Sequence, residues 1–148
     1  MEDIQLPHGV SLAIVYVDEH LIELEAAVES DHWSGRARAY TVPQAIEAFG
    51  FALKRFADAV DAVAEFEAGA DTGIGLIALR FYRVDRAGHI ACHVRLVTGG
   101  LPNDFRPEEV FRLSIEMQTE TWAVVRFARQ INEMAQARAG QALLQVEV

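Results

Sequence analysis

Hydrophobic and polar residues alternate along the first third of the chain. Residues 10–17 are β-branched and aromatic without a helical period, which predicts a well-buried strand. Residues 20–30 place aliphatic side chains on one face and glutamates on the other, a pattern typical of a half-buried strand. After a turn at residues 31–35, the period of two resumes and predicts a third strand over residues 36–42.

The period changes to three and four residues at Pro43, which is a favourable first residue of a helix, with Thr41 as a candidate cap. The apolar stripe predicts an amphipathic helix of about five turns. Gly50 interrupts the stripe, and we expect it to allow close packing against the sheet. The stripe consists of Ile46, Phe49, Leu53, Phe56, Val60 and Val63.

The second half of the chain predicts three strands and a second helix. Residues 76–84 and 89–98 alternate on either side of a four-residue turn that ends in Gly88, which predicts a hairpin. Residues 110–117 form the next strand, and a helix runs from Thr119 or Thr121 to Gly140. Glycines and polar residues in 65–75 predict a turn region. The segment from Leu143 to Val148 is either a short last strand or a tail.

The order of elements predicts an α+β protein. Three strands, a helix, three strands and a helix (βββα-βββα) indicate an antiparallel sheet of about six strands in two meanders. Each long amphipathic helix has one apolar stripe, so we expect both helices to pack on one face of the sheet. No linker divides the chain, and residues 1–148 are expected to form a single domain.

Composition excludes several classes of protein. The 148 residues are 51% hydrophobic and 24% charged, with a formal net charge of -9. This charge argues against a general nucleic-acid binder and against docking on anionic membranes. Cys92 is the only cysteine, so an intramolecular disulfide is excluded. The chain shows neither a signal peptide nor an apolar run of about 18 residues, and a cytoplasmic location is expected.

The negative charge is concentrated near the N-terminus. The first 33 residues contain eight acidic and no basic side chains, whereas the remaining 115 contain 14 acidic and 13 basic ones. A clustered charge of this kind either keeps the surface solvated or docks a basic partner. Arg36 and Arg38 are expected to neutralise part of it across a hairpin. The candidate partner-binding residues are Glu19, Glu23, Glu25, Glu29 and Asp31.

The sequence carries no catalytic signature, and we expect neither a metal nor a cofactor. His89 and His93 lie about 13 Å apart along a strand, too far to share one ion. His20 and His32 stand among carboxylates, where solvated or capping roles are favoured over a metal site. Cys92 falls on the apolar face of its strand, where a buried thiol is unreactive.

The polar face of the second group of strands is a further candidate site. Arginine and tyrosine are frequent at binding hot spots, and a cluster of cations could hold a carboxylate or phosphate. The alternative is an ordinary solvated sheet face. A ligand or enzyme site here requires a concave pocket in which these side chains converge. The candidate residues are Arg80, Tyr82, His93, Arg95 and Arg112.

Four stretches together carry a resemblance to a known family: VESDHWSGRARAY (28–40), FGFAL (49–53), FYRVDRAGH (81–89) and VRFARQI (125–131). They resemble the WapI-like bacterial immunity proteins and related uncharacterised single-domain proteins, over roughly residues 10–138. Trp33 stands where the family more often has phenylalanine. The resemblance implies the fold and, for members with an assigned role, neutralisation of a nuclease toxin. It implies no catalytic residues.

Three hypotheses follow. The first is a non-catalytic interaction protein of the immunity type, which occludes a basic nuclease toxin with its acidic surface. The second is a small-molecule or anion-binding protein, or an enzyme, that uses the Arg/Tyr/His face. The third is a structural homodimer in which Leu143 to Val148 pairs as an edge strand with a second copy.

Overall fold

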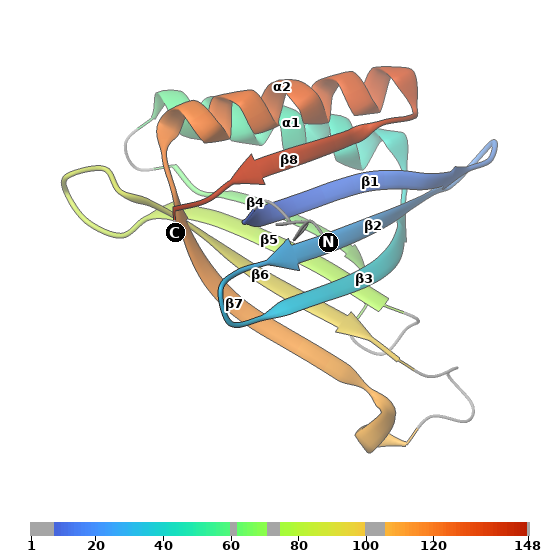
Figure 1. The fold of residues 1–148 in the computed structure, drawn as a ribbon. Coiled ribbons are helices and arrows are strands. Elements are labelled where there is room, and N and C mark those ends of the chain that lie inside the picture. Colours follow the sequence, from blue (N-terminus) through green and yellow to red (C-terminus); the bar gives the residue numbers. More distant parts are fainter. Residues whose placement is uncertain (1–7, 60–61, 71–74, 100–105, 148) are drawn as a thin grey trace, which may run out of the picture.

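The computed structural model describes residues 8–59, 62–70, 75–99 and 106–147. Figure 1 shows two sheets, one in front of the other, with two long helices side by side along one border. The elements in chain order are β1 (Gly9–Val17), β2 (Ile22–Glu29), β3 (Ser34–Thr41), α1 (Pro43–Asp58), β4 (Ala64–Gly69), β5 (Gly75–Arg83), β6 (Ile90–Thr98), the short 3-10 helix η1 (Pro107–Glu109), β7 (Phe111–Thr119), α2 (Thr121–Ala137) and β8 (Gln141–Gln145).

The α+β class and the two helices are confirmed, but the single sheet of about six strands is wrong. The described strands form two antiparallel sheets, which we call sheet A (order β3-β2-β1-β8) and sheet B (order β4-β5-β6-β7). The order is therefore not βββα-βββα. The C-terminal strand β8 returns to pair with β1, and β4 adds a strand to the second meander.

The missed strand β4 lies in the segment expected to be a turn. Helix α1 ends at Asp58, not near Val63, and Val63 is exposed outside the helix; Val60 lies outside the described residues. Ala64, Phe66 and Ala68 then point inward, and Glu65 and Glu67 point outward. Arg83 closes the end of α1 by donating hydrogen bonds to the carbonyl oxygens of Phe56 and Ala59, at 3.0 and 2.8 Å.

The two helices close the open side between the sheets. In Figure 1, α2 runs beside β8 of sheet A, and α1 lies behind α2. Gly50 allows the close approach of the helices to each other, since a Cβ there would lie 2.1 Å from Oδ1 of Asn132 on α2. The expectation that Gly50 packs on a sheet is therefore wrong. The helix begins after Val42, and Thr41 belongs to β3 and does not cap it.

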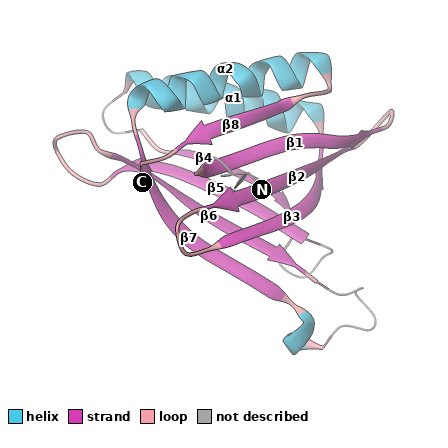
Figure 2. Ribbon diagram, viewed as in Figure 1, coloured by secondary structure: helices cyan, strands magenta, loops and turns pink. Residues whose placement is uncertain are grey.

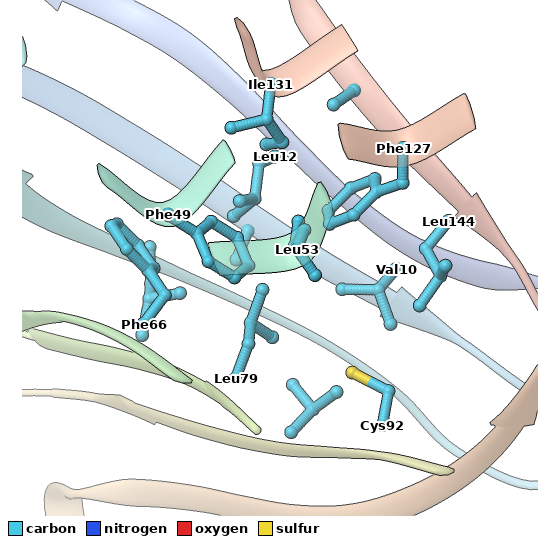
Figure 3. Packing of buried hydrophobic residues seen from close by; sticks show 14 of the residues in the cluster. Val10, Leu12, Phe49, Leu53, Phe66, Leu79, Cys92, Phe127, Ile131 and Leu144 are labelled. Carbon is cyan, nitrogen blue, oxygen red and sulfur yellow. The ribbon is translucent and has the colours of Figure 1, made fainter. Parts of the chain in front are cut away.

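Phe49 on α1 is the centre of the core. Its ring stacks on Phe66 of β4 at a centroid distance of 4.8 Å and lies 6.2 Å from Phe81 of β5 and 6.3 Å from Phe127 of α2. Figure 3 shows Phe49 between Phe66 on one side and Leu53 and Phe127 on the other. One continuous apolar cluster contains residues from both sheets and both helices.

The sheets approach each other most closely at β3, which crosses sheet B. A Cβ on Gly75 would lie 2.1 Å from the carbonyl oxygen of Arg38, so only glycine fits there. At the β7 edge of sheet B, the strand extends beyond the part of the sheet that sheet A covers (Figure 2). Its residues point as the sequence predicts, but Phe111 is 70% exposed while Met117 is buried. The predicted inward face of β7 is therefore buried only toward its C-terminal end.

Candidate functional site

The outer face of sheet A carries the acidic row that the sequence predicts. In the register, Glu25 lies opposite Arg38 and Glu23 lies opposite Tyr40. Arg38 pairs with Glu25 at 3.2 Å and with Glu23 at 3.8 Å, and Arg36 reaches diagonally to Glu25 at 3.5 Å. The prediction that Arg36 and Arg38 neutralise part of the acidic row is confirmed. The middle of this row is therefore nearly neutral.

The five acidic candidates are spread along sheet A from one end to the other. Glu19 lies in the β1–β2 turn with its side chain 93% exposed. Glu29 and Asp31 lie at the opposite end, where Asp31 pairs with His8 at 3.2 Å. Glu29 borders a shallow hollow of about 390 Å³ over Ser11 and Ala27. The structure does not bring all five carboxylates together on one compact surface.

Two tyrosines flank Glu23 on the outer face at the β1–β2 end. Tyr16 lies opposite Glu23 on one side, just after a register shift in β1, and Tyr40 lies opposite it on the other. Tyr16 is 55% exposed and Tyr40 is 45% exposed. The Glu23 carboxylate accepts a hydrogen bond from Tyr40 and raises the pKa of the Tyr40 phenol, because the phenolate would face a negative charge.

The adjoining β1–β2 turn is acidic and locally ordered. Asp18 accepts hydrogen bonds from the backbone N–H groups of His20 and Leu21, both at 2.8 Å. These bonds lower the pKa of the Asp18 carboxyl. Exposed aliphatic side chains lie at the same end of sheet A. We call this surface the hairpin patch, and it consists of Val15, Tyr16, Val17, Asp18, Glu19, Leu21, Glu23, Tyr40 and Val42.

The outer face of sheet B carries the Arg/Tyr/His set. The register places Arg80, Tyr82, His93, Arg95 and Arg112 on this one face, as predicted. Arg80 pairs with Glu65 at 3.2 Å and lies over the Tyr82 ring, Tyr82 donates a hydrogen bond to Glu116, and His93 contacts the Ser114 hydroxyl at 2.8 Å.

These five side chains do not converge on one pocket. A hollow of about 350 Å³ is lined by Arg80, His93 and Arg95, but also by the carboxylates of Glu65 and Glu67 from the missed strand. A second, smaller hollow of about 230 Å³ lies between Arg95, Arg112 and Ser114, and none of its described lining residues is acidic. The cationic character of this face is therefore confined to its β6–β7 side.

Cys92 and His89 have local structural explanations. Cys92 is fully buried, and burial raises the pKa of its thiol well above the usual range. His89 contacts the Asp85 carboxylate at 2.5 Å across the hairpin turn, which raises the pKa of His89 and lowers that of Asp85. Within the described residues, no three His, Cys, Asp or Glu side chains gather in a way that could hold a metal ion.

The outer edge of β8 is already engaged within the chain. The Leu143 N–H donates to the side-chain oxygen of Gln130 on α2 at 2.8 Å, and the Gln145 carbonyl accepts from the Thr119 hydroxyl at 2.7 Å. These are edge groups that a neighbouring strand would need. The structure therefore gives no support to a homodimer through Leu143 to Val148.

Sequence reasoning missed the tyrosines of the hairpin patch. The period of two places Tyr40 in its strand, but its exposure also reflects the position of β3 at the edge of sheet A. Tyr16 faces outward because β1 shifts its register between Ile14 and Tyr16. Such a shift has no clear signal in a continuous apolar run.

The chain matches no protein-family model, and it has no match among curated proteins or solved structures. In the part of the chain that the structure describes, no helix has the length and apolar character needed to cross a membrane. The resemblance to WapI-like immunity proteins therefore remains a prediction.

Replacing Glu23 with glutamine tests the geometry of the hairpin patch. The variant E23Q keeps a hydrogen-bond acceptor but removes the negative charge, so we expect the pKa of Tyr40 to fall. Absorbance or NMR titration of the phenol measures this directly. The control E29Q changes the same charge at the far end of β2 and should leave Tyr40 unchanged. An unaltered Tyr40 titration in E23Q would contradict the contact.

Proposed function

We propose that this protein is a non-catalytic interaction protein that binds a basic protein partner with the hairpin patch. The observation that carries the proposal is the combination of two exposed tyrosines, exposed aliphatic side chains and unneutralised carboxylates at one end of sheet A. Tyrosine supplies a large contact area at low cost in conformational entropy and is enriched at binding hot spots.

The charge distribution supports a basic partner rather than an acidic one. Arg36 and Arg38 neutralise the middle of the acidic row, whereas Asp18 and Glu19 in the turn form no ion pair with Lys or Arg among the described residues. Local acidic charge speeds the encounter with a basic surface and orients it, while the apolar and aromatic groups supply the affinity after contact.

The mode of action that fits such a surface is occlusion. A nuclease binds its substrate through cationic groups, and an acidic-aromatic patch placed over those groups would exclude nucleic acid. The resemblance to WapI-like immunity proteins implies a partner of this class. The proposal requires no catalytic residue in the chain.

Photo-crosslinking from the patch tests this proposal. We would place p-benzoylphenylalanine at Tyr16, and in a matched control at Phe51, which is 62% exposed on α1. In lysate of the native host, the Tyr16 probe should crosslink a basic protein and the Phe51 probe should not. The association rate of that purified protein should fall at least about tenfold between low and high salt.

A partner that crosslinks equally from both positions would contradict docking on the hairpin patch. A partner that binds at the same rate at all salt concentrations would contradict charge-directed docking, even if the contact surface were correct.

A second candidate function is anion binding at the β6–β7 side of sheet B. The observation that favours it is the hollow whose described lining residues include two arginines, Arg95 and Arg112, and the hydroxyl-bearing Ser114. A carboxylate or phosphate group would accept charge-assisted hydrogen bonds there. The open and shallow hollow suits the end of a ligand rather than a whole enclosed molecule.

NMR titration with inorganic phosphate and with acetate tests this second function. We expect saturable shifts at the amides of Arg95 and Ser114, and R95Q should weaken binding about tenfold. R36Q removes an arginine from the outer face of sheet A and should leave the titration unchanged. Absence of saturable shifts with both anions would rule out the site.

A further inference from the structure

The outer edge of β7 is the open edge of sheet B. Figures 1 and 2 show β7 as the outermost strand, with no other strand beside it. The hydrogen bonds between described residues use this edge once, where the Glu147 N–H donates to the Gln118 carbonyl at 2.8 Å. Edge strands with free backbone groups are templates for pairing with another strand.

That one contact shows which backbone groups of β7 point toward the outer edge. Because Gln118 accepts from Glu147 and not from β6, its backbone groups point away from β6. The pairing of β6 with β7 runs without a register shift, and backbone groups alternate along a strand. The N–H and C=O groups of Glu116, Ser114 and Arg112 therefore also point to the outer edge.

The side chains beside this edge are complementary to themselves. Arg112 and Glu116 lie on the same outer face of sheet B, two residues to either side of Ser114. A two-fold axis through Ser114 places Arg112 of one copy directly opposite Glu116 of the other, twice. It also places Leu113 opposite Ile115 on the inner face, where both side chains are only partly buried.

We propose that two copies of this chain associate through antiparallel pairing of β7 with β7, centred on Ser114. The two sheets B then form one continuous sheet across the two-fold axis, as in other cases of strand addition. Shifting the axis by one residue along β7 would place Arg112 opposite Ser114 or Gln118. Only the Ser114-centred register pairs opposite charges, and Glu147 at Gln118 marks the end of the ladder.

The same pairing explains the exposed apolar groups on the inner side of β7. Phe111 is the most exposed of the large hydrophobic side chains described, at 70%. In the paired arrangement it lies opposite Met117 of the second copy, near that copy's covered core. The interface lies on sheet B, so it leaves the hairpin patch of sheet A available.

Variants that reverse one charge of each cross-axis pair test this proposal. Sedimentation equilibrium at a series of protein concentrations measures how strongly each variant dimerises. We expect the wild type to dimerise. R112E places two carboxylates opposite each other in each half of the interface, and E116R does the same with two guanidinium groups. Each substitution should raise the dimer dissociation constant about tenfold or more.

Complementation is the decisive arm of the test. An equimolar mixture of R112E and E116R restores opposite charges in both pairs, and we expect it to form a heterodimer more readily than either variant forms a homodimer. The control R95E makes the same charge change on β6, one strand away from the edge, and should dimerise like the wild type. Thermal unfolding by circular dichroism shows that each variant is folded.

If E116R unfolds because it lacks the hydrogen bond from Tyr82, S114P serves as the test variant instead. Proline removes the central edge N–H and is tolerated on edge strands, so it should abolish the dimer of a folded protein. A wild type that stays monomeric at all concentrations would overturn the proposal. So would a dimer that neither R112E nor S114P weakens.

Discussion

The fold depends on the packing of Phe49 against aromatic rings from three other elements. Phe66, Phe81 and Phe127 reach it from β4, β5 and α2, and the aliphatic inner face of sheet A completes the cluster. Neither sheet can bury its inner face alone, since each has only four strands and one polar side. The helices are therefore part of the same core as both sheets.

Because the inner faces of both sheets form this core, the polar side chains lie on the outer faces and at the edges of the sheets. On sheet A, the arginines of β3 neutralise the middle glutamates and leave the acidic excess at the two ends. On sheet B, Glu65 of β4 pairs with Arg80, and Glu116 of β7 accepts a hydrogen bond from Tyr82. The surfaces that stand out are the hairpin patch, the small hollow beside Arg95, and the open edge of β7. All three suit binding.

Local patterns predicted the elements and faces that short-range contacts determine. The glutamate row of β2, the helix start at Pro43 and the two hairpins follow from periods and turns within a few residues. The division into two sheets did not, because it depends on β8 returning to β1 across most of the chain. Strand β4 was missed although residues 64–68 alternate between inward and outward positions. The neighbouring glycines indicate a turn, and the apolar stripe of α1 continues in the sequence past the end of the helix. Exposure of Tyr40 and Phe111 depends on which strands become edges, and the outward position of Tyr16 depends on the register shift in β1. Both are properties of the assembled sheets.

The free energy of unfolding of F49A, compared with that of F51A, tests most directly whether one core joins the sheets and helices. Both variants remove a phenylalanine ring from α1, but Phe49 is 2% exposed and Phe51 is 62% exposed. In urea titrations followed by circular dichroism and by NMR signals from both sheets, F49A should lose about 3–5 kcal/mol, and both sheets should unfold in one transition. F51A should lose less than about 0.5 kcal/mol. Equal losses in the two variants, or separate transitions for the two sheets, would contradict a core centred on Phe49.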